Sequence, residues 1–167
     1  MLSFARGINS RDEIVGRYLD KAQNFHGFLR KRDQYASIDV PFPGAFSTQA
    51  FGINDRGEIV GSYSISGGTQ HGFLKKRSTF THIDFPGAVS TNPVGINNRG
   101  EIVGSYLDSS LATHGFIFAN GEFTRLDASF AGNPGVVATA PLGISDLSEI
   151  VGTYNLGGKT FGFLAKP

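Results

Sequence analysis

Aromatic and imidazole side chains recur in this sequence at a spacing that suits the binding of a sugar. In three places a tyrosine precedes a histidine by seven intervening residues, and a fourth tyrosine precedes a phenylalanine; the residues are Tyr18, His26, Tyr63, His71, Tyr106, His114 and Tyr154. Aromatic faces stack on the apolar face of a sugar, while hydroxyl and ring N–H groups bond its hydroxyls. The pattern predicts repeated carbohydrate pockets or, as the alternative, side chains that hold neighbouring repeats together.

Four glutamates recur in the same way: Glu13, Glu58, Glu101 and Glu149. If the repeats surround one axis, their carboxylates form a ring that could hold Ca²⁺, because hard cations prefer oxygen ligands. The alternative is local pairing with a turn N–H or with the arginine two residues earlier, as at Arg11, Arg56 and Arg99. No other cofactor is expected. A three-histidine zinc site is not expected, because the histidines of different repeats would lie too far apart.

An asparagine recurs four residues before a glutamate in three repeats, at Asn9, Asn54 and Asn97. Ser145 takes this place in the last repeat. Asparagine at the end of a strand commonly builds a turn by bonding the backbone two residues on. This local chemistry explains the residue choice, and a ligand role near the axis is the alternative.

Two clusters of positive charge occupy equivalent places in the first two repeats: Arg30, Lys31, Arg32, Lys75, Lys76 and Arg77. On adjacent repeats they would form one cationic patch at the rim, which could bind an acidic polysaccharide. The alternative is protection of outer strands, because lysine and arginine there discourage edge-to-edge pairing.

Familiar catalytic motifs are absent from the sequence. There is no Gly-x-Ser-x-Gly elbow, no His-Glu-x-x-His, no phosphate-binding glycine loop and no cysteine nucleophile. The loops at the Tyr/His end offer Asp20, Asp108 and Lys159 without an evident general acid and base pair. We therefore favour a non-catalytic binding or scaffold module. A glycan-acting hydrolase or lyase and a purely structural spacer are the alternatives.

The candidate residues recur because the chain itself is a repeat. The string GINDRGEIVGSY at Gly52 has counterparts at Gly7, Gly95 and Gly143, at spacings of 43 to 48 residues. A second marker, HGFL, HGFI or FGFL, follows each time, and a third, such as FTHIDF, follows in the first three units. The chain is thus one domain, 1–167, with units at about 3–46, 47–90, 91–137 and 138–167.

Each unit is expected to form four short strands, and the chain to be all-β. Apolar runs bounded by Gly, Pro, Asn and Asp favour strands, and no segment has a 3.6-residue stripe. Four antiparallel strands in a unit of this length are typical of a β-propeller blade. Gly52 and Gly61 would let backbones approach closely. We expect a four-bladed ring with a three-stranded last blade, or half of a larger ring closed by dimerisation.

The strings IDFPGA, GINNRGEIVGSY and HGF resemble the HAF family of probable extracellular repeats, found mostly in bacteria. The resemblance covers almost the whole chain, although the family's His-Ala-Phe is His-Gly-Phe here and Phe161-Gly162-Phe163 in the last unit. It implies a secreted or cell-surface protein. It implies no known activity, so it carries over no catalytic residues.

Composition excludes several classes of protein. The formal net charge is +1, which gives no general attraction to nucleic acid or anionic lipid. The chain has no cysteine for disulfides, no apolar run long enough to span a membrane, and no signal peptide as given. Nucleic acid is therefore not an expected partner, and no membrane span is expected.

The last unit predicts self-association. Its sequence stops before the third marker, so TFGFLAKP would be an outer edge with Phe161, Phe163 and Leu164. An apolar edge of this kind invites pairing with another chain. We expect either edge pairing of four-bladed rings or two half-rings that close into one.

Overall fold

The computed structural model describes residues 2–128 and 136–167. Within them the chain is all-β, as predicted, with fifteen strands and no helix. It follows that no described helix is long and apolar enough to cross a membrane.

The strands form four consecutive units, each an antiparallel meander. Unit 1 contains β1 (Ser3–Ile8), β2 (Ile14–Leu19), β3 (Phe25–Lys31) and β4 (Gln34–Ile38). Unit 2 contains β5 (Ala45–Ile53), β6 (Ile59–Ile65), β7 (Gln70–Lys76) and β8 (Thr79–His82). Unit 3 contains β9 (Ser90–Ile96), β10 (Ile102–Leu107), β11 (Thr113–Ala119) and β12 (Glu122–Leu126). Unit 4 contains β13 (Val136–Ile144), β14 (Ile150–Leu156) and β15 (Lys159–Ala165), and thus has the three strands that the sequence predicts.

The first turn of every unit needs a residue with positive φ. Gly57 (φ 76°) and Gly100 (φ 85°) supply it in units 2 and 3, where glycine adopts this conformation without steric cost. Asp12 (φ 58°) and Ser148 (φ 61°) supply it in units 1 and 4. The turn fixes the register of the strands that follow, so the whole repeat starts from the same hairpin.

Neighbouring units meet through a column of glycines in their first strands. A Cβ placed on Gly7 would lie 2.7 Å from the carbonyl oxygen of Phe51, and one on Gly52 would lie 2.9 Å from that of Val94. A Cβ on Gly95 would lie 3.4 Å from the Cα of Gly143. The close approach expected at Gly52 is thus confirmed, because no side chain fits between the backbones there.

Apolar side chains fill the space between units on either side of this column. The forward face of a unit, which packs on the next unit, carries a valine and an aliphatic residue opposite it, such as Val15 and Leu29. The backward face of the next unit packs isoleucines and aromatic rings against them, such as Ile53, Ile59 and Phe73. The same arrangement recurs between units 2 and 3, with Val60, Leu74, Ile96, Ile102 and Phe116.

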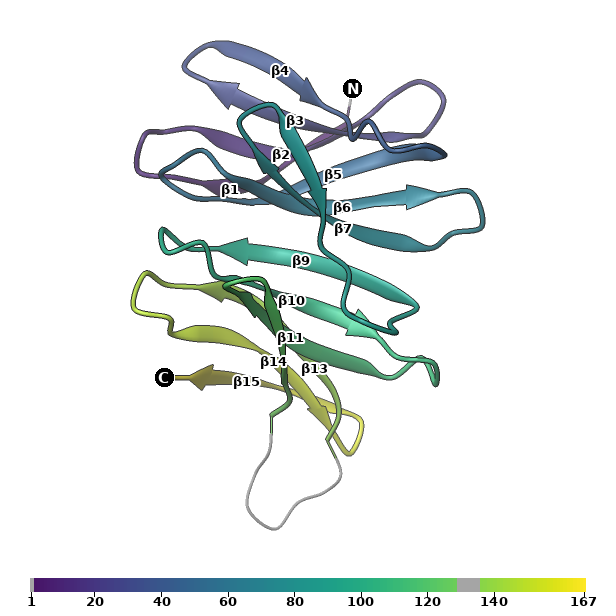
Figure 1. The fold of residues 1–167 in the computed structure, drawn as a ribbon, viewed down its shortest axis with the longest axis vertical. Helices are drawn as coiled ribbons and strands as arrows, with labels where there is room; N and C mark the ends of the chain where they lie inside the picture. The colour runs from purple at the N-terminus through teal and green to yellow at the C-terminus, as the bar shows by residue number, and fades with distance from the viewer. Residues whose placement is uncertain (1, 129–135) are drawn as a thin grey trace.

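The four units lie in an open row. Figure 1 shows unit 1 and unit 4 at opposite ends of the long axis. Ile8 on the backward face of unit 1 is 62% exposed, whereas Ile53 is 7% exposed. Val151 on the forward face of unit 4 is 51% exposed, whereas Val60 is fully buried. The expected closed ring of four is therefore not confirmed, because the two end faces do not pack on each other.

The glycine column supplies a matched pair of substitutions. We expect Gly52→Ala to lower the free energy of unfolding by about 1–3 kcal/mol, because the added methyl overpacks against the backbone of unit 3. Gly143→Ala should change it by less than about 0.5 kcal/mol, because the nearest atom to its Cβ is Val151 Cγ2 at 3.7 Å. Urea unfolding measures both. Equal losses in the two variants would contradict the column as a close contact between units.

Candidate functional site

The structure brings each predicted tyrosine beside its histidine. Tyr18 and His26 are directly opposite on β2 and β3, and their ring centroids lie 5.2 Å apart. The pairs Tyr63–His71, at 5.4 Å, and Tyr106–His114, at 5.2 Å, repeat this arrangement. Tyr154 lies opposite Phe161 at 5.3 Å. These residues occupy the edge of each unit that is farthest from the glutamate turns.

An aspartate that the sequence analysis missed holds each histidine. The Nδ1 atom of His26 lies 2.8 Å from Asp39, that of His71 lies 2.9 Å from Asp84, and that of His114 lies 3.1 Å from Asp127. Each aspartate follows its histidine by thirteen residues, within the third marker. This fixed spacing was the signal in the sequence that could have revealed the pairs.

A second aspartate bonds the other ring nitrogen in units 1 and 3. Asp20 lies 3.2 Å from Nε2 of His26, and Asp108 lies 3.2 Å from Nε2 of His114. Burial alone would lower the pKa of His26, but the hydrogen bonds that its ring donates to Asp39 and Asp20 outweigh it and raise the pKa. Both nitrogens of these two histidines are therefore engaged within the chain, which leaves neither free to bond a sugar hydroxyl.

Phenylalanines from the segments between units cover two of the tyrosines. Phe42 lies 5.2 Å from the ring of Tyr63 and stacks on His82 at 3.8 Å. Phe85 stacks on Tyr106 at 3.8 Å, with only 5° between the ring planes. Tyr63 is 3% exposed, and its burial raises its pKa to about 12. In units 2 and 3 the tyrosine faces therefore belong to the core between units, and a sugar cannot stack on them.

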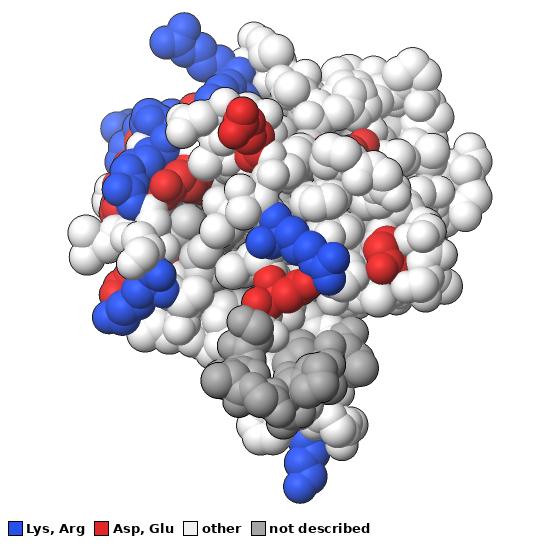
Figure 2. Space-filling view, turned by 60° about the horizontal axis from the view of Figure 1, so that its bottom comes forward, with Lys and Arg blue, Asp and Glu red and all other residues white. Residues whose placement is uncertain are grey.

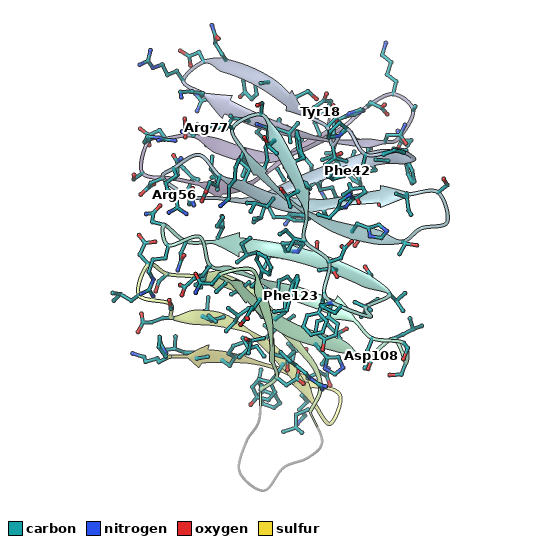
Figure 3. The ribbon with its side chains drawn as sticks, viewed as in Figure 1. Tyr18, Phe42, Arg56, Arg77, Asp108 and Phe123 are labelled. Atoms are coloured by element: carbon teal, nitrogen blue, oxygen red, sulfur yellow. The ribbon has the colours of Figure 1, made fainter. Side chains whose placement is uncertain are left out.

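Tyr18 has a different environment, because none of the described units packs on the backward face of unit 1. Its ring lines a cavity of about 740 Å³ on the backward face of unit 1, together with Ile14, Phe28 and Tyr35. Tyr35 is 70% exposed. Figure 3 shows Tyr18 near the upper end of the row and Phe42 below it. The Tyr18 cavity corresponds in position to the places that Phe42 and Phe85 fill in units 2 and 3.

The glutamates pair locally instead of meeting around an axis. Glu13, which is buried, accepts hydrogen bonds from Arg11 at 2.6 Å and Asn9 at 2.7 Å and pairs with Lys31 at 2.9 Å. Glu58 repeats this with Arg56, Asn54 and Lys76, Glu101 pairs with Arg99, and Glu149 pairs with Lys166. Among residues 2–128 and 136–167, no group of three or more His, Asp or Glu side chains could hold a metal ion.

The asparagines form a ladder that ties each turn to the next unit. Asn9 Nδ2 donates to the backbone oxygen of Asn54, Asn54 Nδ2 to that of Asn97, and Asn97 Nδ2 to that of Ser145, each at 3.0 Å. The Oδ1 atom of each asparagine also accepts bonds from the N–H groups of its own turn, as predicted for this turn type. The ladder ends at Ser145, which has no side-chain amide.

The two basic clusters are partly used within the fold. Lys31 and Lys76 are the partners of Glu13 and Glu58, and Arg30 pairs with Asp33 at 3.4 Å. Figure 2 shows Lys and Arg side chains gathered on the left side of the molecule with acidic residues among them. The patch expected at the rim is therefore of mixed charge rather than uniformly cationic.

Comparisons with known proteins find distant similarity to solved structures. No protein-family model matches the chain, and no curated protein matches it. Among solved structures, the gluconolactonase XC5397 from Xanthomonas campestris is similar over 100% of this chain and 77% of that chain, with a TM-score of 0.48 and 8% identity. A similarity this distant assigns neither residues nor an activity to this chain.

The glutamate cluster of unit 1 predicts a pH dependence. Burial alone would raise the pKa of Glu13, but hydrogen bonds from Arg11, Lys31 and Asn9 outweigh it and lower the pKa from 4.5 to about 2. The carboxylate therefore stabilises the fold above its unfolded pKa, and this contribution is lost as the pH falls toward the folded value. We expect the free energy of unfolding to fall between about pH 5 and pH 2, and to fall less in Glu13→Gln.

Urea unfolding across this pH range provides the measurement. Glu122→Gln, at an exposed position in β12, serves as the control and should retain the slope of the unmodified chain. An unchanged slope in Glu13→Gln would show that the cluster does not hold Glu13 ionised.

Proposed function

We propose that this chain is a non-catalytic scaffold module, a run of β-propeller blades that assembles through its two end faces. The observation that carries the proposal is that each end face repeats the side chains that are buried between units inside the chain. Engagement of both ring nitrogens of His26 and His114 by carboxylates supports a non-catalytic role. The resemblance to HAF repeats supports a location outside the cell or on its surface.

The forward face of unit 4 exposes the same kinds of apolar side chains that are buried at the interfaces between units. Val151 and Leu164 are directly opposite each other on β14 and β15 and are 51% and 56% exposed. Their counterparts in unit 2, Val60 and Leu74, are 0% and 8% exposed because unit 3 covers them. Leaving such a pair in water forfeits about 1.5–3 kcal/mol for each side chain, which favours a partner on this face.

The backward face of unit 1 supplies the complementary surface. It presents Ile8 and Ile14 and the Tyr18 cavity at the positions where units 2 and 3 present Ile53, Ile59 and their covered tyrosines. A second copy of the chain therefore carries, on unit 4, the kind of surface that packs on unit 1. Such a head-to-tail contact closes a ring if the rotation between copies allows it.

We assign this partner to a second copy, so that two open rows close into one ring with both end faces buried. Ser145 lacks the amide of the asparagine ladder, so the contact between copies depends on apolar packing. This assembly would cover the Tyr18 cavity, and we therefore assign that cavity to the copy–copy contact rather than to a sugar.

Sedimentation equilibrium at micromolar concentration tests the assembly. The unmodified chain should have the mass of a dimer, and Val151→Glu should have that of a monomer, because it places a charge in the apolar contact. Leu111→Glu, at an equally exposed position in the loop before β11, should remain a dimer. A monomeric unmodified chain, or a Val151→Glu variant of unchanged mass, would refute the proposal.

A further inference from the structure

A polar groove crosses the first strands of all four units, away from the end faces. It has a volume of about 460 Å³ and contains Arg6 of β1, Phe51 of β5, Val94 of β9 and Leu142 of β13. Its remaining lining residues are polar: Arg17, Gln49, Gln70 and Asn92. The groove has no acidic lining residue, so its charged groups are both cationic.

Arg17 is held in a fixed position in this groove. Its guanidinium carbon lies 4.3 Å from the ring centroid of Phe25 and 5.1 Å from that of Phe4. Its Nη1 atom donates to Oε1 of Gln49 on β5. Two aromatic rings and one hydrogen bond thus immobilise the side chain, and little conformational entropy remains to be lost when it binds a ligand.

The positive charge of Arg17 has no acidic partner in the described residues, and Arg6 shares this property. The arginines that pair with carboxylates there are Arg11, Arg30, Arg56, Arg99 and Arg125. Arg6 lies near Arg17, since both line the groove and the Arg6 guanidinium carbon lies 6.0 Å from the centroid of the same Phe4 ring. Burial, and then the charge of Arg6, lower the pKa of Arg17. Two cations are therefore close together without an acidic partner in the described residues, an arrangement that favours the binding of an anion.

Buried polar atoms without a hydrogen-bond partner in the protein gather at the same place. In the described part of the chain they are Nε of Arg17, Oδ1 of Asn92 and Oγ of Ser62. Arg17 and Asn92 line the groove, and Ser62 is the cross-strand neighbour of Gln49. Such atoms are rare in folded proteins and indicate a bound water or ion or a functional role. Among the lining residues they are a donor on the cation Arg17 and the amide oxygen of Asn92.

We propose that this groove binds a sugar acid, with the carboxylate on Arg17 and Arg6 and the hydroxyl groups on Asn92, Gln49 and Gln70. Guanidinium groups bind carboxylates with two parallel hydrogen bonds, and side-chain amides both donate to and accept from hydroxyl groups. Phe51, Val94 and Leu142 provide apolar contacts for the face of the ring. This inference goes beyond the scaffold role, and it moves the predicted carbohydrate site from the Tyr/His pairs to the groove.

The position of the groove in the repeat explains why the repeated residues did not reveal it. Ser62 and Ser105 occupy the place of Arg17 in units 2 and 3, and Thr153 occupies it in unit 4. Phe51, Val94 and Leu142 likewise occupy the place of Arg6. Both arginines therefore belong to unit 1 alone, and the site is asymmetric, as a single binding site requires.

Isothermal titration calorimetry with D-glucuronate, D-glucose and inorganic phosphate tests the proposal. The titrations use the monomeric Val151→Glu variant, so that failure of the assembly does not affect the result. We expect glucuronate to bind, glucose to bind at least roughly tenfold more weakly, and added salt to weaken the binding of glucuronate. Arg17→Met should reduce the affinity for glucuronate by roughly tenfold or more. Arg32→Met, in the exposed turn after β3, should leave it unchanged.

Arg17→Met could reduce binding by disturbing the fold, because Arg17 packs on two aromatic rings. A second variant therefore tests the binding role separately. Arg6→Met alters an exposed side chain and should also weaken the binding of glucuronate, with an unchanged unfolding midpoint. Equal affinity for glucuronate and glucose, tighter binding of phosphate, no binding at millimolar concentration, or equal binding by the Arg6→Met and Arg32→Met variants would each overturn the proposal.

Discussion

The contact of backbone against backbone at the glycine column is the constraint on which the rest of the structure depends. Because Gly7, Gly52 and Gly95 have no side chain, the first strands of neighbouring units approach closely, and the flanking Val and Ile side chains can then interlock. The asparagine ladder adds one hydrogen bond per junction at the end of the same strands. Each junction therefore combines close packing with a fixed register. The apolar packing recurs at the junctions of units 1–2 and 2–3, whereas units 3 and 4 are also joined by a parallel pairing of β11 with β13 at Thr113 and Ala138. Other repeat proteins likewise bury the faces of their units against neighbouring units.

The apolar side chains on the two end faces of the row are exposed in the described structure, and the proposed assembly would bury them. A single unit cannot bury its own apolar face. The forward face of unit 4 and the backward face of unit 1 therefore expose the same kinds of apolar side chains that the interior junctions bury. The groove illustrates the opposite case. There, Arg6 and Arg17 replace the residues that the other units have at these two positions. A position at which one unit differs from the others is where a function specific to that unit is to be expected.

Much of the fold could be predicted from the sequence, because local chemistry determines it. Four short antiparallel strands per unit were expected, and units 1 to 3 have them. The asparagine turns follow from residue types alone. Closure of the row could not be predicted, because it depends on the rotation between units, which is set by how Phe42, Phe85 and the isoleucines pack. The groove could not be predicted for a related reason: recurrence identifies residues that every unit shares, whereas Arg17 occurs in unit 1 alone and its neighbours come from different units.

A disulfide formed between copies tests most directly the claim that the end faces belong together. The chain has no cysteine, so single cysteines can be placed at Ile8 and at Val151 without background. Their counterparts inside the chain, such as Ile53 and Val15, share one buried cluster. When the Ile8→Cys and Val151→Cys variants are mixed under mild oxidation, a cross-linked pair containing one of each should form rapidly, and a Leu111→Cys variant mixed with either should not cross-link. Cross-linking of Ile8→Cys with itself, or equal yields in all mixtures, would contradict the head-to-tail contact.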